Sequence, residues 1–485
     1  MTRVQTRHSA VAGRPRPLVV DLDDTLLCTD TLVESVVELA FSQPREFLGA
    51  LPALRHGRAA FKHAVAEHVR LDYATLPYDQ KILGFIRHRR TAGGAVYLVT
   101  GADRSIAAGV ASHLGLFDGV IASDGTRNLK GASKASALVE MLGPDFDYLG
   151  DHLADLPVWE AAQQVYVAGK GGAAVRALTR RGIPVVRRFP APDMSPREWV
   201  KALRLHQWSK NLLLFVSVFL GQEFGDRAVV SRVMLGFLAF GLVASATYLF
   251  NDIKDLSADR RHFGKRHRAM ASGRLSLQSG FALALVLLLV GIAGGFALMP
   301  AFGLVLVGYV VLTLAYTLWL KEQALIDVLA IGGLFTVRVQ ASVVLTEDEA
   351  SVWLTCFAFV LFTSLAMAKR HAELVRAKQD QREIVGRGYR ATDIPLTVGV
   401  GLATAAVSVI EMLLYLQLDA RHVGLYERTG SLLLIPIVLT SWLMRIWVKA
   451  HRGELHDDPV VFATKDKISI FHAFAVGLLW LMAVV

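Results

Sequence analysis

The stretch Tyr248–Arg274 reads YLFNDIKDLSADRRHFGKRHRAMASGR and lies between two apolar segments, each long enough to cross a bilayer. It places Asn251, Asp252, Asp255 and Asp259 at positions i, i+1, i+4 and i+8. On a helix leaving the membrane, this spacing brings the three carboxylates to one face. Grouped carboxylate oxygens suit Mg²⁺, which proteins usually hold with one or two carboxylates plus substrate phosphates. The stretch therefore predicts a magnesium site, with Asn251 as a further oxygen ligand.

A basic cluster follows these acidic residues directly. Its members are Arg260, Arg261, His262, Lys265, Arg266, His267 and Arg268. We expect these cations to bind the same phosphates as the metal. The alternative is a solvated loop whose charges only set membrane topology. The regular spacing of the acids and the adjacent cations favour a binding site.

The composition indicates a membrane protein with more than one domain. The chain has 485 residues, of which 53% are hydrophobic, and a formal net charge of +10. Its two cysteines, Cys28 and Cys356, are far apart, which excludes a disulfide framework and a Cys/His zinc site. We expect Cys28 to pack in the interior. Residues 1–17 are basic and lack an apolar core, so we expect no secretory signal and a cytosolic start.

The part of the chain up to residue 190 has the pattern of an α/β domain with a Rossmannoid parallel sheet. Short apolar runs alternate with helical patterns, and turn residues bound each run. The runs are LVV before Asp21, AVYLV before Thr100, GVIAS at Ser123, FDYLG before Asp151 and VYVAG at Val165. Runs of this length are typical of buried parallel strands.

Polar motifs follow several of these runs. They are Asp21-Leu22-Asp23-Asp24-Thr25, Thr100-Gly101 and Gly150-Asp151-His152-Leu153-Ala154-Asp155, while Lys134 opens a helical stretch. Open α/β sheets build their sites at the carboxyl ends of the strands. The set fits phosphoryl transfer through an aspartyl phosphate, in which one carboxylate attacks phosphorus and a second protonates the leaving oxygen. A hydroxyl and an ammonium would hold the phosphate, and a further acid would help to hold Mg²⁺.

The four motifs, in this order, resemble those of the haloacid dehalogenase (HAD) superfamily of phosphatases. The resemblance implies that residues 1–190 form a HAD-like domain and that the helical insert at residues 31–80 forms a cap over its site. The implied roles are nucleophile for Asp21, general acid/base for Asp23, phosphate binding for Thr100, Gly101 and Lys134, and Mg²⁺ binding for Asp21, Asp23, Asp151 and Asp155. Asp155 could instead support the metal ligands, and Lys130 competes with Lys134 because spacing alone does not separate them. An inactive HAD fold is the alternative.

The junction at Ile183–Pro196 carries four prolines and two arginines, a composition typical of a linker. Ser195-Pro196-Arg197-Glu198 then predicts a helix start, with Ser as N-cap, Pro at the first position and Glu at the third. The helix is expected to be amphipathic through Trp199 and Trp208 and to lie at the membrane surface. Linker and interfacial helix together would occupy residues 191–210.

Residues 211–485 are expected to form an all-α bundle of nine transmembrane helices. Nine apolar segments have approximate centres at Val216, Gly241, Leu288, Gly308, Phe335, Val360, Ala405, Ile437 and Val476. Most reach the roughly 20 residues that a spanning helix needs, and the first is short. Lys and Arg gather in alternate loops, which face the cytosol by the positive-inside rule. We therefore expect a multi-pass protein of the bacterial plasma membrane, with the HAD-like domain and both sites facing the cytosol.

Polar residues inside or beside membrane spans are expensive in lipid and point to function. Here they are Lys210, Asn211, Tyr316, Lys321, Glu322, Asp327, Arg338, Lys369 and Arg370. All except Arg338 are expected near the cytosolic face, beside Asp252. Arg338 could instead form a structural ion pair, and Lys321 and Asp327 could be helix-end anchors.

Nine helices with N-D-x-x-D-x-x-x-D after the second resemble the UbiA superfamily of intramembrane prenyltransferases, over residues 197–485. Four segments resemble in particular its decaprenyl-phosphate phosphoribosyltransferase branch: HQWSKNLLLF, HFGKRHRAMASGRL, LKEQALIDV and DDPVVFATKDK. That branch transfers 5-phosphoribose from phosphoribosyl diphosphate to a polyprenyl phosphate. Ordinary UbiA enzymes carry a second D-x-x-x-D cluster, whereas this chain has Lys321-Glu322 and a single Asp327 at that place, which favours the branch.

The resemblance implies a membrane enzyme that uses phosphoribosyl diphosphate and a polyprenyl phosphate, with no nucleic-acid partner. Mg²⁺ would bind Asp252, Asp255 and Asp259 with Asn251, and the implied substrate-binding residues are Lys210, Asn211, Lys265, Arg268, Lys321, Asp327, Arg338, Lys369 and Arg370. The HAD unit would then remove the 5-phosphate, which gives polyprenyl-phosphoryl ribose. The alternatives are a prenyltransferase that moves an isoprenyl group to a small acceptor and a transporter or lipid-binding protein with a regulatory HAD unit. The pattern is compatible with a homo-oligomer.

Overall fold

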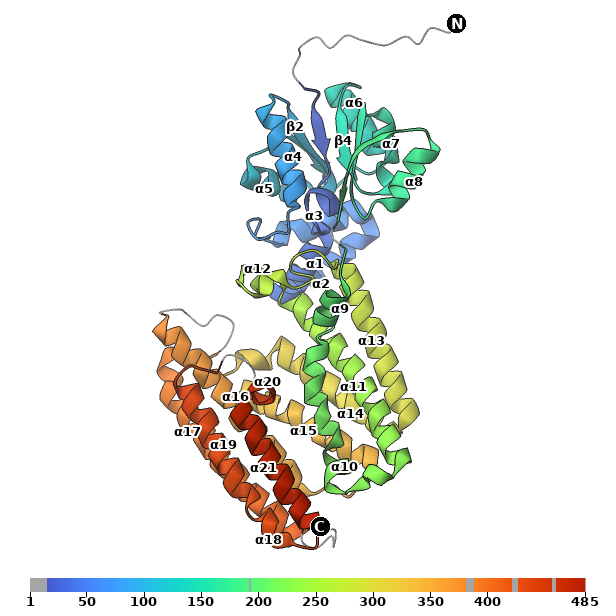
Figure 1. The fold of residues 1–485 in the computed structure, drawn as a ribbon. Coiled ribbons are helices and arrows are strands. Elements are labelled where there is room, and N and C mark those ends of the chain that lie inside the picture. Colours follow the sequence, from blue (N-terminus) through green and yellow to red (C-terminus); the bar gives the residue numbers. More distant parts are fainter. Residues whose placement is uncertain (1–14, 192, 381–387, 421–425, 456–458, 485) are drawn as a thin grey trace. The chain divides into compact units, whose positions relative to one another are not determined.

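The computed structural model describes residues 15–191, 193–380, 388–420, 426–455 and 459–484 (Figure 1). By its internal contacts the chain divides into two units. The N-terminal unit comprises Met1–Ala202 and Phe250–Ala282, and the helical unit comprises Leu203–Leu249 and Leu283–Val485. Residues 250–282 therefore group with the N-terminal unit, although they interrupt the apolar half in sequence. The basic segment before residue 15 and the pair Asp457-Asp458 lie outside the described residues.

A six-stranded parallel sheet forms the centre of the N-terminal unit. Its spatial order is β3-β2-β1-β4-β5-β6, and every pairing is parallel. The strands are β1 (Leu18–Val20), β2 (Val96–Asp103), β3 (Gly119–Ser123), β4 (Asp147–Gly150), β5 (Gln164–Gly169) and β6 (Val185–Pro190). The predicted parallel α/β architecture is confirmed, and the five apolar runs form the first five strands. Since β1 lies between β2 and β4, the residue that follows it lies at the middle of one sheet edge.

Helices cover both faces of this sheet, and the side chains of β1 point alternately to the two faces. Leu18 and Val20 pack into a core with α4 (Gln80–Thr91) and α5 (Arg104–Leu114). Val19 points to the opposite face, where the core includes residues of α6 (Ala132–Leu142), α7 (Leu156–Ala161) and α8 (Gly172–Arg180). Successive side chains of a strand point to opposite faces, so a three-residue apolar strand serves both cores.

The edge strand β6 occupies part of the segment Ile183–Pro196, which was predicted to be a linker. Arg187 and Arg188 are exposed, and Pro190 closes the strand. An edge strand forms ladder hydrogen bonds on one side only, so it tolerates charges and a terminal proline. The linker prediction was wrong for residues 185–190 because edge strands and linkers share this composition.

The helices predicted between residues 31 and 80 are present. They are α1 (Thr31–Ser42), α2 (Pro44–Ala50), the 3-10 helix Leu51–His56 and α3 (Arg58–His68), here called the helical insert. Leu39, Ala50 and Val65 form a small core of their own. The insert follows β1 and its polar motif directly, so its first helix starts ten residues after Asp21.

The helix predicted at Ser195 begins as expected but ends early. The backbone N–H and Oγ of Ser195 donate to Glu198 Oε2 at 2.7 and 2.9 Å, which forms the predicted cap of α9 (Pro196–Ala202). Arg204 adopts a left-handed backbone, with φ of 52°, and this breaks the helix. A continuous amphipathic helix through Trp208 is therefore wrong, and Leu205–Phe215 forms a 3-10 helix instead.

Eight helical segments in the described part of the chain are long and apolar enough to span a membrane, which makes the chain a multi-pass membrane protein. They are α11 (Arg227–Lys254), α13 (Leu277–Leu298), α14 (Pro300–Leu318), α15 (Ile326–Thr346), α16 (Val352–Gln379), Ala391–Ala420 with α17 (Ile394–Tyr415), Thr429–His451 with α19 (Ile435–His451), and α21 (Lys467–Val484). Within the described ranges, the predicted count of nine is not confirmed. The segment at Val216 forms the 3-10 helix and the five-residue α10 (Val216–Leu220), which is too short to span.

Candidate functional site

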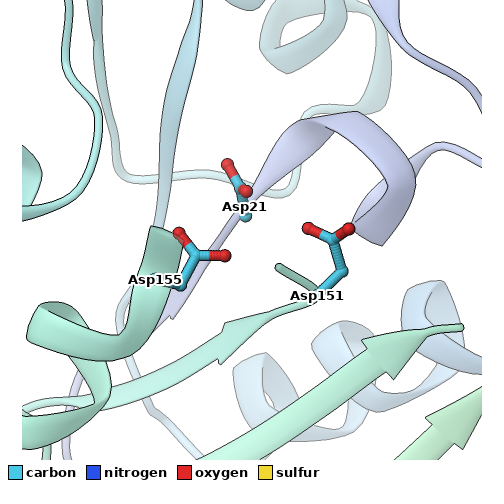
Figure 2. Close-up of side chains that lie close together, drawn as sticks. All are labelled: Asp21, Asp151 and Asp155. Atoms are coloured by element: carbon cyan, nitrogen blue, oxygen red, sulfur yellow. The ribbon is translucent and has the colours of Figure 1, made fainter. Parts of the chain in front are cut away.

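Three carboxylates converge at the carboxyl edge of the central strands. Asp21 follows β1, Asp151 follows the neighbouring β4, and Asp155 precedes α7. One ligand atom from each of the three side chains lies within 4.8 Å of the other two. Figure 2 shows the three side chains. Parallel strands that pair end at the same edge, which is why residues far apart in sequence meet here.

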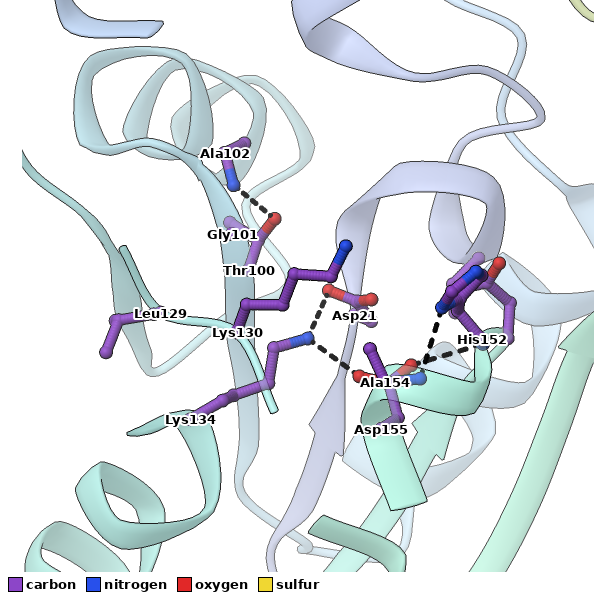
Figure 3. Close-up of polar contacts among 12 residues, drawn as sticks. Asp21, Thr100, Gly101, Ala102, Leu129, Lys130, Lys134, His152, Ala154 and Asp155 are labelled. Carbon is purple, nitrogen blue, oxygen red and sulfur yellow. Dashed lines mark hydrogen bonds and ion pairs between the residues drawn. The ribbon is translucent and has the colours of Figure 1, made fainter. Parts of the chain in front are cut away.

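Lys134 offsets part of this negative charge. Its Nζ lies 3.0 Å from Asp21 Oδ1 and 3.1 Å from Asp155 Oδ1 (Figure 3). Burial acts to lower the pKa of this lysine, but the two carboxylates outweigh burial and raise it. Lys130, the rival in the sequence, is exposed, and the ion pair to Asp21 comes from Lys134.

Asp155 is already held by neighbours through both oxygens. Its Oδ1 accepts hydrogen bonds from Lys134 Nζ and from Tyr148 Oη at 3.1 and 3.0 Å. Its Oδ2 accepts from the backbone N–H of His152 at 3.2 Å. A carboxylate fixed in this way positions its neighbours, so Asp21 and Asp151 are the better metal ligands.

Burial and neighbouring charges raise the pKa values of Asp21 and Asp151. Burial, opposed by Lys134, raises the pKa of Asp21 to about 6. Burial, together with the charges of Asp21 and Asp155, raises the pKa of Asp151 to about 9. A divalent cation relieves this repulsion, and hard carboxylate oxygens are the ligands that Mg²⁺ prefers. The residues therefore fit Mg²⁺.

The other predicted residues of this edge are fixed by backbone groups. The backbone N–H of Thr31, the first residue of α1, donates to Asp23 Oδ1 at 2.8 Å. Thr100 is fully buried, and its Oγ1 accepts from the backbone N–H of Ala102 at 3.0 Å. The helical insert thus contacts the side chain that the sequence suggests as the general acid.

Lys62 was missed by sequence reasoning. It lies on α3 of the helical insert, and its Nζ donates to the carbonyl oxygen of Gly101 at 2.6 Å. Burial lowers its pKa, while Asp23 acts to raise it. A lysine in a polar helix carries no local signal of function, and only the fold brings it to the edge.

The aspartate-rich stretch forms the end of one helix and the start of another. α11 ends at Lys254 and α12 (Leu256–Arg261) follows, so Asp255 lies at a break. One uninterrupted helix was the wrong expectation, yet Asp252 and Asp259 share a partner. Arg268 Nη1 lies 2.9 Å from Asp252 Oδ1 and 2.5 Å from Asp259 Oδ2.

The remaining predicted members of this cluster also lie close. Asn251 Nδ2 donates to Asp255 Oδ2 at 3.0 Å, and Lys265 Nζ lies 3.8 Å from Asp259 Oδ1. Asp259 is buried, whereas Lys265 is exposed. Among the described residues, however, only Asp21, Asp151 and Asp155 bring three ligand atoms within 4.8 Å of one another, so the three carboxylates of this stretch do not converge in the same way. Arg268 instead lies between two of them.

Arg338 organises a buried network in the helical unit. Its Nε donates to Asn211 Oδ1 at 3.0 Å and its Nη2 to Tyr309 Oη at 3.2 Å. Its guanidinium lies 5.0 and 5.6 Å from the ring centroids of Phe240 and Phe335. The contacts described for Arg338 include no carboxylate, so they do not form the structural ion pair considered above.

A second network surrounds Asp327, which is fully buried. Arg370 Nε donates to Asp327 Oδ2 at 2.5 Å, and Tyr389 Oη donates to Asp327 Oδ1 at 2.6 Å. Arg370 also contacts Glu373 Oε2 at 2.5 Å. Tyr389, 62 residues from Asp327, had no signal in the sequence.

The three predicted lysines of the helical unit lie on different elements. Lys210 Nζ lies 5.4 Å from the ring centroid of Phe335, Lys321 belongs to the 3-10 helix Leu320–Glu322, and Lys369 belongs to α16. Lys321 and Lys369 are half-buried.

Comparison with known proteins identifies a matching family. The family model "UbiA prenyltransferase family" matches residues 212–483. An uncharacterised protein, y4nM, of Sinorhizobium fredii is 44% identical over 97% of this chain and 91% of its own length. Nodulation protein NoeC of Azorhizobium caulinodans is 30% identical over 59% of this chain and 93% of its own length. A decaprenyl-phosphate phosphoribosyltransferase of Mycobacterium tuberculosis is 37% identical over 37% of this chain and 61% of its own length.

Proposed function

Because the chain belongs to the UbiA prenyltransferase family, we propose that it is a polyprenyl-phosphate phosphoribosyltransferase with a HAD-type phosphatase in its N-terminal unit. It transfers 5-phosphoribose from phosphoribosyl diphosphate to a polyprenyl phosphate, and the phosphatase removes the 5-phosphate from the product. The observation that carries the transferase part is the 37% identity to the mycobacterial phosphoribosyltransferase. The distribution of Lys and Arg among the loops supports a plasma-membrane enzyme with both sites on the cytosolic side.

The transfer is a displacement at the anomeric carbon of ribose. The lipid phosphate oxygen forms the new bond, and the bond to the diphosphate breaks. Mg²⁺ held by Asp252, Asp255, Asp259 and Asn251 would supply positive charge for the leaving diphosphate. The lipid phosphate is already an anionic nucleophile, so the protein needs no strong base. Its task is to bind phosphates and to orient the sugar.

Charged and polar residues of both units have separate roles in the proposed transfer. Arg268, which lies between Asp252 and Asp259, would turn toward the diphosphate, and the exposed Lys265 would join it. Asp327 would orient ribose hydroxyls from its fixed position. Further candidates for binding donor or acceptor are Lys210, Asn211, Lys321, Arg338, Lys369 and Arg370.

The phosphatase reaction uses the sheet edge. Asp21 attacks phosphorus, the bond between phosphorus and the sugar 5-oxygen breaks, and Asp23 gives its proton to that oxygen. Water then attacks the aspartyl phosphate, Asp23 takes its proton, and inorganic phosphate leaves. Thr100, Gly101 and Lys134 would hold the phosphate. Mg²⁺ on Asp21 and Asp151, with the support of Asp155, would offset its charge.

An Asp21→Asn variant tests the pairing of the two reactions. Given phosphoribosyl diphosphate, a polyprenyl phosphate and Mg²⁺, the wild type should form polyprenyl-phosphoryl ribose. The variant should accumulate the 5-phosphorylated lipid at the wild-type rate of transfer, as measured by mass spectrometry of extracted lipids. If the variant still forms the dephosphorylated lipid at the normal rate, the N-terminal unit does not carry out this step.

A true prenyl transfer is the second candidate, because the matching family model is that of prenyltransferases. In that case an isoprenyl diphosphate would be consumed with a small acceptor, and no ribose would enter the lipid. The single Asp327, where a second acidic cluster would bind a prenyl diphosphate, favours phosphoribosyl transfer.

A further inference from the structure

The helical insert is attached to the aspartate-rich segment by a buried ion pair within the N-terminal unit. Arg260 of α12 donates from Nη1 to Glu34 Oε2 at 2.9 Å and from Nη2 to Glu34 Oε1 at 2.6 Å. Glu34 lies on α1, and the side chains are only 3% and 5% exposed for Glu34 and Arg260. Two parallel hydrogen bonds between a guanidinium and a carboxylate fix orientation as well as distance.

Other residues of α1 extend this contact. Ser257 Oγ donates to Glu38 Oε2 at 2.5 Å, and the rings of Phe41 and Phe250 lie 5.8 Å apart, edge to face. Glu34, Glu38 and Phe41 are spaced i, i+4 and i+7, which places them on one face of α1. Three residues on one face of α1 therefore contact residues 250–260.

Within the same unit, the loop after α12 closely approaches the residues that follow β1. Gly273 has φ of 73°, and a Cβ built there would lie 2.6 Å from both the Cβ and the carbonyl oxygen of Cys28. A side chain at position 273 would thus clash with the backbone after the first strand motif.

The ion pair connects residues of both proposed reactions. α1 begins at Thr31, whose N–H holds Asp23, and Arg260 directly follows Asp259. Arg260 Nε also donates to the carbonyl oxygen of Ala271 at 3.1 Å, which fixes the loop that carries Arg268. Arg260 is thus tied to the insert, to Asp259 and to the Arg268 loop.

We propose that Glu34 is a positioning residue for the transferase reaction, although it belongs to the phosphatase insert. Through Arg260 it fixes the relative positions of Asp259 and the Arg268 loop, so the insert is a structural part of the transferase metal site. A buried guanidinium that loses its carboxylate cannot stay in place without cost, and α12 would move. The role of Glu34 in transfer rests on the proposed function. The attachment of the helical insert to α12 through Glu34 and Arg260 does not.

The experiment compares the full-length variants Glu34→Gln and Glu46→Gln. Glu46 lies on α2 of the same insert and is exposed, so it is the matched control. Glu34→Gln should lower kcat/KM for transfer about tenfold or more and raise the Mg²⁺ concentration for half-maximal transfer, because the metal site is distorted. Glu46→Gln should leave both unchanged.

Hydrogen exchange provides a readout that needs no activity. In Glu34→Gln, amides of residues 255–274 should lose about tenfold in protection, while those of β4 and β5 keep theirs. Unchanged exchange, or unchanged transfer despite altered exchange, overturns the proposal. If the wild type forms no ribosylated lipid yet exchange responds as expected, the proposed function fails and the attachment stands. Loss of protection throughout the N-terminal unit would show general unfolding and would also overturn a specific positioning role.

Discussion

At the scale of single residues, Lys134 decides the arrangement of the sheet-edge site. It is 3% exposed and pairs with two of the three converging carboxylates. The motifs predicted these acids because each follows a strand. The motifs did not separate Lys134 from Lys130, because either lysine has a spacing that fits the motif. In the fold Lys134 is buried at the site, whereas Lys130 is exposed.

Lys134→Ala should reduce hydrolysis of ribose 5-phosphate at least about a hundredfold, because charge stabilisation by one preorganised group is typically worth that much. Lys130→Ala, four residues away and exposed, is the control and should stay within a few fold of the wild type. Steady-state kinetics of phosphate release measure both. Equal loss in the two variants would mean that Lys130 shares the phosphate.

Asp252→Asn should abolish phosphoribosyl transfer while phosphate release from ribose 5-phosphate stays normal. The substitution removes one charged ligand from the proposed metal site and leaves the sheet edge untouched. Labelled phosphoribosyl diphosphate measures transfer, and Asp419→Asn, in the helical unit, serves as control. Full transfer by Asp252→Asn would show that this carboxylate is not part of the transferase site, and no transfer by the wild type would favour a transporter or lipid-binding protein.

At the scale of elements, the strands were more predictable than the breaks in helices. Five apolar runs became five buried strands, because a buried parallel strand has a compact hydrophobic signal. The missed features depend on tertiary packing. β6 has the composition of a linker, Arg204 breaks a helix with a left-handed backbone, and Asp255 separates α11 from α12. Lys62 and Tyr389 join their networks across many residues, so local sequence gave no sign of them.

Gly401→Ala should destabilise the packing of α17 against α19. A Cβ at this position would lie 2.0 Å from two ring carbons of Trp447, whereas a Cβ at Gly399, on the same helix, meets nothing within 4 Å. Overpacking of this kind costs about 1–3 kcal/mol. Thermal unfolding in detergent should show a lower midpoint temperature for Gly401→Ala than for the wild type. The matched Gly399→Ala should keep the wild-type midpoint. Equal midpoints would contradict the packing described here.

At the scale of the whole molecule, two sets of acids in one chain suggest consecutive reactions. The relative from Sinorhizobium fredii aligns over 97% of this chain, so the combination of both units recurs in at least one other protein. The sequence predicted the multi-pass architecture, but not the grouping of residues 250–282 with the N-terminal unit. The contact between Glu34 and Arg260, which are 226 residues apart, is one of those inside this unit.

The central claim is that the 5-phosphoribosyl group of phosphoribosyl diphosphate is transferred to a lipid phosphate, with release of diphosphate. The most direct test supplies the purified protein with Mg²⁺, a polyprenyl phosphate and phosphoribosyl diphosphate carrying ¹³C in the ribose, followed by mass spectrometry of the lipid fraction. The account predicts a polyprenyl-phosphoryl pentose that contains the labelled ribose and lacks the 5-phosphate. A lipid fraction without label, with the phosphoribosyl diphosphate unconsumed, would contradict it.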